Sequence, residues 1–107
     1  MILSTTELVP GYRVTEILGL VRGSTVRARF IGRDIKALFR NIVGGEVDEY
    51  TKMLAEAREQ SLDRMREQAV ALQADAVLMV RLSSSQVMSG AAEVVAYGTA
   101  VKLAPRG

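Results

Sequence analysis

The chain is 107 residues long, which suits one domain with a single modest core. Hydrophobic residues make up 49% of it and charged residues 24%, a balance typical of a globular protein and not of a disordered one. Cysteine and histidine are both absent. This excludes disulfides, thiolate metal sites and Ser-His-Asp or Cys-His catalysis within the chain. We therefore treat residues 1–107 as one domain.

The start of the chain lacks the features of an export signal. Residues 1–7 contain no basic residue ahead of an apolar core, and no apolar run approaches the length that crosses a membrane. We expect a cytoplasmic protein with no membrane partner.

Strands and turns are predicted for the first 30 residues. A short strand candidate at 2–6 is followed by Pro10-Gly11, a pair that suits the central positions of a type II turn. A strand then resumes at 12–21, with Gly19 as a bend or bulge.

The next glycine, in Arg22-Gly23-Ser24, is predicted to turn the chain into a second strand at 25–30, so the region is interpreted as hairpin-like. These glycines lack the lysine and spacing of a phosphate-binding loop.

Two amphipathic helices are predicted next. The first is short and follows the i, i+3, i+4 spacing of Ile35, Leu38, Phe39, Ile42 and Val43. Gly44-Gly45 ends it and permits a reversal into a long helix at 46–73.

The long helix has an apolar stripe and an acidic face. The stripe contains Val47, Tyr50, Leu54, Ser61, Met65, Ala69 and Leu72. Small residues near its middle, Ala57 and Ser61, would let the helix lie close to a sheet. Glu46 falls in the first turn, where the helix dipole favours negative charge.

Arg58 interrupts the apolar side of this helix. An unpaired guanidinium loses its hydration there without compensation, so we expect a partner. Asp34, Asp75 and Glu93 are the candidates outside the helix. The alternatives are that the stem of Arg58 covers the core while its head reaches water, or that it forms an ion pair across a subunit contact.

The last third of the chain is predicted to be β-structure. The runs 76–80 and 94–97 are apolar at successive positions, on either side of a Ser89-Gly90 turn, and such strands have both faces covered. The expected fold is α+β, an antiparallel β-sheet covered by one short and one long amphipathic helix. Two helices cover one face, so the other requires another copy of the chain, and we expect a homo-oligomer.

Charge is unevenly distributed around a net charge of +2. Basic residues dominate from Arg13 to Arg40, and the long helix carries the acids. Only Phe30 and Phe39 lie near the basic region, both at apolar positions, so nucleic acid is a minority interpretation beside intersubunit contact. Met53, Met65 and Met79 are interpreted as core residues ahead of soft-metal ligands.

Several segments together resemble the YbjQ-like family of small bacterial proteins. They are Thr5-Thr6, Gly11, 19–23, Gly44-Gly45-Glu46, Tyr50-Thr51, Ala57-Arg58, Arg64-Met65, Asp75-Ala76-Val77 and the ending 93–101. The resemblance implies an α+β subunit in a homopentameric ring and a family labelled as heavy-metal-binding. It implies no catalytic residues.

The most direct functional prediction is a non-enzymatic ring-forming protein, binding or structural, with a ligand or ion at subunit contacts. Glu46, Tyr50, Arg58 and Arg64 are the candidate ligand-binding residues. Heavy-metal-ion binding is the alternative by resemblance, with no metal ligands identified. An enzyme using carboxylates and arginine stays open, although no paired acids stand out and 83–85 has no base nearby. The sequence identifies no cofactor.

Overall fold

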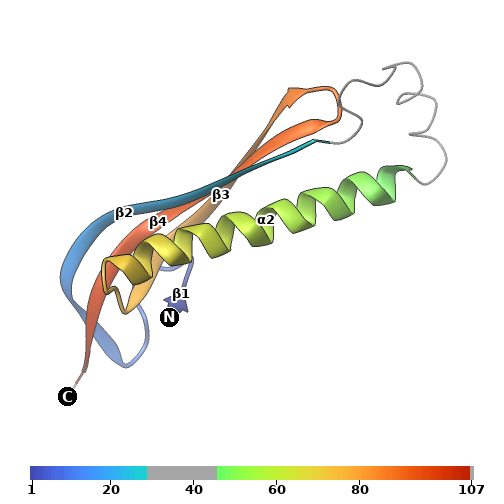
Figure 1. Ribbon diagram of the computed structural model, residues 1–107. Coiled ribbons are helices and arrows are strands. Elements are labelled where there is room, and N and C mark those ends of the chain that lie inside the picture. The colour runs from blue at the N-terminus through green and yellow to red at the C-terminus, as the bar shows by residue number, and fades with distance from the viewer. Residues whose placement is uncertain (29–45, 107) are drawn as a thin grey trace.

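The computed structural model describes residues 1–28 and 46–106, and the elements are arranged as a sheet with one helix on it (Figure 1). In chain order they are β1 (Ile2–Leu3), β2 (Tyr12–Ala28), α2 (Glu46–Ala71), β3 (Ala76–Met88) and β4 (Ala91–Pro105). The short helix expected around residues 35–43 and the Gly44-Gly45 reversal lie outside the described residues.

The four strands form one mixed sheet in the order β1-β3-β4-β2. β4 pairs antiparallel with both β2 and β3, whereas β1 pairs parallel with β3. The prediction of a purely antiparallel sheet was therefore wrong. The N-terminal segment runs beside β3 in the same direction: Ser4 N–H donates to the Val77 carbonyl and Val80 N–H to the Ser4 carbonyl, both at 2.9 Å.

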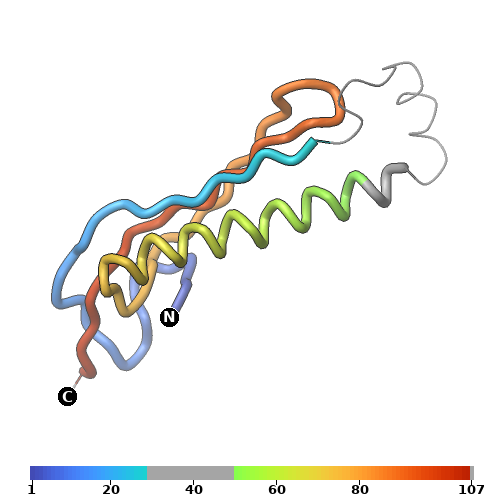
Figure 2. Tube along the Cα trace, viewed as in Figure 1, coloured from blue at the N-terminus to red at the C-terminus, as the bar shows by residue number. Residues whose placement is uncertain are grey.

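β2 is one continuous strand of 17 residues, so the predicted hairpin with a turn at Arg22-Gly23-Ser24 was wrong. Those residues lie inside the strand and pair with residues 95–97 of β4. The bulge expected near Gly19 is confirmed by a register shift between Ile17 and Gly19 and by a φ of +124° at the glycine. β2 is strongly curved at this end of the sheet (Figure 2).

The turns predicted at Pro10-Gly11 and Ser89-Gly90 are confirmed. Tyr12 N–H donates to the Val9 carbonyl at 3.1 Å across Pro10-Gly11, and Gly11 has the positive φ of +84° that a type II turn requires at that position. Ser89-Gly90 joins β3 to β4.

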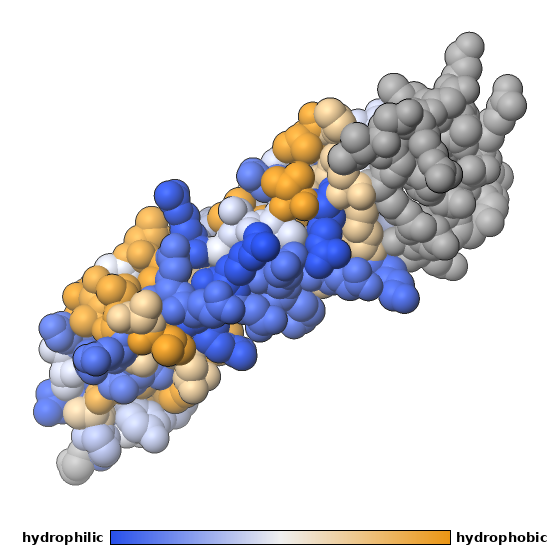
Figure 3. Space-filling view, in the orientation of Figure 1, coloured by the Kyte–Doolittle hydropathy of each residue, from blue (hydrophilic) through white to orange (hydrophobic). Residues whose placement is uncertain are grey.

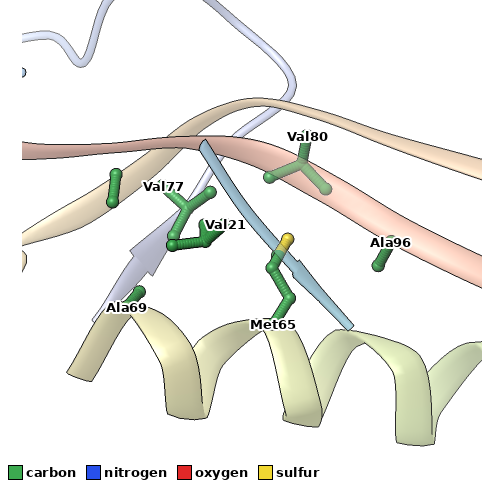
Figure 4. Packing of buried hydrophobic residues seen from close by; sticks show 7 residues of the cluster. Val21, Met65, Ala69, Val77, Val80 and Ala96 are labelled. Carbon is green, nitrogen blue, oxygen red and sulfur yellow. The ribbon is translucent and has the colours of Figure 1, made fainter. Parts of the chain in front are cut away.

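The buried side of α2 follows a row of residues spaced four apart. These are Met53, Ala57, Ser61, Met65 and Ala69, each at most 8% exposed. Such a row contributes about one residue per turn, so the buried face of the helix is narrow. The predicted stripe shares three of these positions, but Leu72 lies beyond the helix and is 45% exposed. Figure 4 shows Met65 and Ala69 pointing into the core towards Val21 and Val77.

The helix and the sheet approach each other very closely at Gly23. A Cβ placed on Gly23 would lie 2.3 Å from the Ser61 carbonyl oxygen and 2.4 Å from the Met65 nitrogen. Ser61 Oγ lies 2.8 Å from the Ala57 carbonyl oxygen and 2.9 Å from that of Val94, and donates to both. The prediction that Ala57 and Ser61 allow close packing is confirmed.

The second face of the sheet, away from α2, is covered in one half only. Near β1, Ala76, Leu78 and Val101 are buried, and Val9 and Leu103 pack against them. In this half the chain itself covers the second face, which explains the apolar run at 76–80.

The other half of the sheet is different. It comprises residues 20–28 of β2, 81–88 of β3 and 91–99 of β4, and we call it the distal half. On its second face Leu20 is 68% exposed, Val26 60% and Tyr97 41%. Within the described residues the chain does not cover this part of the second face, so its cover by another copy stays a prediction.

The contact at Gly23 yields a stability prediction. Gly23→Ala should lower the free energy of unfolding by about 3 kcal/mol or more, because the new methyl group meets helix backbone that cannot rotate away. Urea denaturation measures the change. Ser24→Ala, on the adjacent exposed residue, is the control and should cost about 0.5 kcal/mol or less. Equal losses in the two variants would contradict the close contact.

Candidate functional site

α2 lies over β2 and β4 and leaves β3 less covered. The helix contacts β2 at Gly23 and β4 at the Val94 carbonyl, whereas Leu82 of β3, although it pairs with buried Ala96, is 45% exposed. A groove therefore runs along each side of the helix. We call them the β2 groove and the β3 pocket.

The β2 groove is the larger, with a volume of about 620 Å³. It is lined by Arg22, Gly23, Ser24, Arg64, Glu67, Gln68 and Ala71. Arg22 and Arg64 are positively charged and Glu67 is negatively charged, so the lining carries a net positive formal charge. Its floor is the point where the helix touches Gly23.

Three side chains of α2, spaced four residues apart, reach β2, two of them from the lining of this groove. Gln68 Oε1 accepts the Arg22 N–H at 2.9 Å. Arg64 Nη1 donates to the Ser24 carbonyl at 2.6 Å. Gln60 Oε1 accepts Arg27 Nη2 at 3.0 Å. Because β2 is the last strand of the sheet, the first two contacts satisfy backbone groups that have no neighbouring strand.

The β3 pocket, on the other side of the helix, is small, with a volume of about 70 Å³. Its lining consists of Leu54, Arg58, Leu82, Ser83, Ser84 and Val94. Arg58 is exposed, so the prediction that it is desolvated on the apolar side was wrong. Its stem passes along apolar neighbours while its head reaches water, which is the alternative the sequence allowed.

The expected partners of Arg58 are accounted for in part. Asp75 Oδ2 accepts a hydrogen bond from the Leu103 N–H of β4 at 2.8 Å, so this carboxylate binds the backbone and not Arg58. Glu93 precedes Val94, which faces the helix, and therefore belongs to the second face of the sheet. Asp34 lies outside the described residues.

The four candidate ligand-binding residues do not form one site in a single subunit. Arg58 lies in the β3 pocket and Arg64 in the β2 groove, on opposite sides of α2. Tyr50 is half-buried in the second turn of the helix. Glu46 is the first residue of α2, and its side chain is outside the described part of the structure.

Sequence reasoning missed a row of polar side chains on the second face. Arg22, Tyr97 and Arg81 pair in register across β2, β4 and β3. Gly23 and Ala96 face the helix. Side chains alternate along a strand, so Arg22 and Tyr97, which are next to them in the sequence, face away from the helix. Arg81 is held there by donating from Nη1 to the Thr5 carbonyl at 3.0 Å. Only the strand register, which the sequence does not show, could have revealed the row.

The acidic face of α2 carries ordinary surface ion pairs. Arg27 lies 3.7 Å from Glu56, and Arg66 lies 3.9 Å from Asp63, with more than a third of each side chain exposed. The exposed side of the helix is hydrophilic (Figure 3).

In the described part of the chain no three Asp or Glu residues are grouped so as to hold a metal ion. No described helix is long and apolar enough to cross a membrane.

Comparison with known proteins matches residues 1–104 to the family YbjQ_1, described as "Putative heavy-metal-binding". The chain belongs to the YbjQ-like family. The resemblance seen in the sequence motifs is thereby confirmed over almost the whole chain.

Relatives in this family are similar along their full lengths. A "UPF0145 protein" of Methanoculleus marisnigri is 59% identical over 106 residues and covers 99% of each chain. One from Thermotoga maritima is 59% identical over 103 residues, covering 96% of this chain and 97% of its own. The relatives include archaeal proteins, so the description of the family as bacterial was too narrow.

A solved structure shows the same fold at low sequence identity. It is a protein of unknown function from the DUF74 family of Pediococcus pentosaceus, with a TM-score of 0.68 and 15% identity. The match covers 97% of this chain and 98% of the solved one.

The contacts of Gln68 yield a prediction about the β2 groove of this family member. Gln68→Ala should accelerate hydrogen exchange of the Arg22 amide, because that N–H loses its only described acceptor and faces solvent. NMR-detected exchange measures it. Glu67→Ala, one residue away, should leave the Arg22 rate unchanged; if it accelerates exchange equally, the hydrogen bond does not protect this amide.

Proposed function

We propose that the protein is a non-enzymatic, homo-oligomeric binding or structural protein whose subunits assemble into a ring. The observation that carries this proposal is the second face of the distal half of the sheet. Leu20, Val26 and Tyr97 lie on it with 68%, 60% and 41% of their surfaces exposed. Fully burying side chains of this size is worth about 1.5–3 kcal/mol each, so a second copy that covers this face would be strongly favoured.

Further exposed apolar side chains lie at the turn between β3 and β4. Val87 is 55% exposed and Met88 57%, and hydrophobic side chains gather at this end of the described surface (Figure 3). Large exposed apolar side chains that gather in one region are characteristic of protein interfaces. The resemblance to the YbjQ-like family makes five the expected number of subunits, and we place the protein in the cytoplasm.

A ligand or ion at the subunit contacts completes the proposal. Arg58 in the β3 pocket and Arg64 in the β2 groove flank α2 on two sides, so adjacent copies in a ring could bring such residues together. Tyr50 and Glu46, nearer the start of α2, remain candidates for the same contacts.

The non-enzymatic assignment follows from the side chains present. The chain has no histidine. Ser83, Ser84 and Ser85 lie within strand β3 and are exposed, and one of them, Ser85, pairs with a residue that bears a carboxylate, Glu93 of β4. A serine nucleophile requires a base that accepts its proton, and no hydrogen bond joins Ser85 to Glu93 in the described structure.

Assembly is tested by placing a charge on the uncovered face. Val26→Glu should reduce the number of subunits, because the carboxylate loses hydration in the interface without a partner. Native mass spectrometry counts the subunits. The matched control is Val70→Glu on α2, where the valine is 58% exposed against 60% for Val26, and it should leave the assembly intact. A monomeric wild-type protein would overturn the proposal.

Heavy-metal-ion binding is the second candidate, favoured by the family description. The residues present do not fit a soft metal. Thiolate and imidazole ligands are absent from the sequence, and two thioethers, Met53 and Met65, are buried in the core at 8% and 0% exposure. Met79 was expected in the core as well, which was wrong, since it is 39% exposed. Carboxylates and the exposed thioethers would be the remaining ligands.

Calorimetric titration tests the metal alternative. We expect heats equal to those of buffer dilution when Zn²⁺, Cd²⁺ or Cu²⁺ is added to the assembled protein, because no thiolate or imidazole is available. Saturable binding with a fixed stoichiometry per ring would favour the metal function instead.

A further inference from the structure

The β3 pocket combines apolar and polar side chains in a small space. It is more enclosed than the β2 groove on the other side of the helix. Its lining consists of three apolar residues, Leu54, Leu82 and Val94, and three polar ones, Arg58, Ser83 and Ser84. Apolar walls with a few polar groups are the usual composition of a small-molecule site.

The strand register turns one hydroxyl of the pocket towards the helix. Ser84 pairs with Val94, which is 1% exposed and faces α2. Residues paired across two strands share a face of the sheet, so the Ser84 side chain points to the same side. A serine hydroxyl can donate a hydrogen bond, and this one lies in the same pocket as the guanidinium of Arg58.

Arg58 has no acidic neighbour on its own helix. Side chains three and four residues apart on a helix lie next to each other. Those positions around Arg58 are occupied by Leu54, Ala55, Ser61 and Leu62. The other two arginines of α2 each have an acid at such a position, Asp63 for Arg66 and Glu67 for Arg64. Among the arginines of this helix, Arg58 is therefore the one without local charge compensation.

The sheet beneath the pocket supplies no acid either, within the described residues. The positions that face the helix there are Leu82, Ser84 and Gln86 of β3 and Ala92, Val94 and Ala96 of β4. Glu93 alternates with them and lies on the second face. The pocket thus has one positive charge beside apolar surface, and its potential favours an anionic occupant.

The lining selects a carboxylate among the anions. The planar fork of one guanidinium matches the two oxygens of a carboxylate. A phosphate group carries close to two negative charges at neutral pH, and the pocket has no second cation in its lining. The volume of about 70 Å³ equals the share of about two water molecules at roughly 30 Å³ each. A short-chain carboxylate fits this space, whereas a nucleotide or a sugar does not.

We propose that the β3 pocket binds a small aliphatic carboxylate from solution, with its oxygens on Arg58 and Ser84 and its short chain against Leu54 and Leu82. This inference rests on the binding function proposed above and names the class of ligand for Arg58. All the lining residues come from one chain. The pocket is therefore complete within a subunit and requires no residue from another copy.

Propionate is the probe, added to the full chain with isotope-labelled leucine and valine methyl groups. We expect the methyl NMR signals of Leu54, Leu82 and Val94 to shift saturably, with a dissociation constant in the millimolar range. Acetate should bind about fourfold more weakly, because it lacks one methylene group. Propionamide, a neutral analogue of the same shape, should bind about tenfold more weakly or less, because it loses the charge-assisted hydrogen bonds.

A pair of variants of α2 assigns the binding to Arg58. Arg58→Gln removes the charge of an exposed side chain and should weaken propionate binding about tenfold or more. Arg66→Gln is the matched control, because Arg66 is exposed on the same helix and lies beside Asp63, and it should bind propionate as the wild type does. No saturable shift in the wild type, equal binding of propionamide, or equal losses in the two variants overturns the proposal.

Native mass spectrometry of the same samples separates this proposal from the assembly. Saturable binding to a monomer means that the pocket is right and the ring is wrong. An oligomer that binds no propionate means that assembly stands and the carboxylate site is wrong. If Arg58→Gln also lowers the number of subunits in such an oligomer, an acidic side chain of an adjacent copy occupies the pocket, and this overturns the binding of a free carboxylate.

Discussion

The contact between α2 and β2 at Gly23 is the constraint on which the rest of the structure depends. A side chain at this position would overlap the backbone of α2 at Ser61 and Met65, so the helix can lie against the strand only because a glycine is there. Ser61 then donates to the Val94 carbonyl and links the same turn of the helix to the next strand. The close approach requires small residues where the backbones meet, namely Gly23 on the strand and Ala57 and Ser61 on the helix, while the buried side chain of Met65 fills the core beside them.

This position of the helix determines which surfaces remain open. Since α2 lies on β2 and β4, Leu82 of β3 is left partly exposed and Arg58 is placed beside it instead of over the core. On the other side the helix is near enough for Gln68 and Arg64 to reach the β2 edge. The candidate binding residues are therefore consequences of how the helix packs, and they face different neighbours.

Local patterns in the sequence predicted the features that depend on local physics. The Pro10-Gly11 turn, the bulge at Gly19 and the long helix follow from residues that lie next to each other in the chain. The role of Gly23 could not be seen in this way. A glycine that is required by contact with distant residues, here Ser61 and Met65 of α2, has the same local signature as a glycine in a turn. The same limit applies to the site: Arg58 was placed on the apolar side from the helical period alone, whereas its exposure depends on how far the helix extends over β3. Arg22, Tyr97 and Arg81 come together only through the strand register.

The apolar character of the strands has two different causes in the two halves of the sheet. Near β1, the second face is covered by the chain itself through Val9 and Leu103, so the run at 76–80 requires no partner. In the distal half no described segment covers the second face. Leu20 and Val26 are therefore exposed there, on a face that also carries Arg22 and Arg81. A face that only had to stay in water would have no need of the valine and leucine, and a face destined for a dry core would not carry two arginines. Apolar residues interleaved with Arg22, Arg81 and Glu93 are typical of a protein interface, which combines apolar and charged contacts.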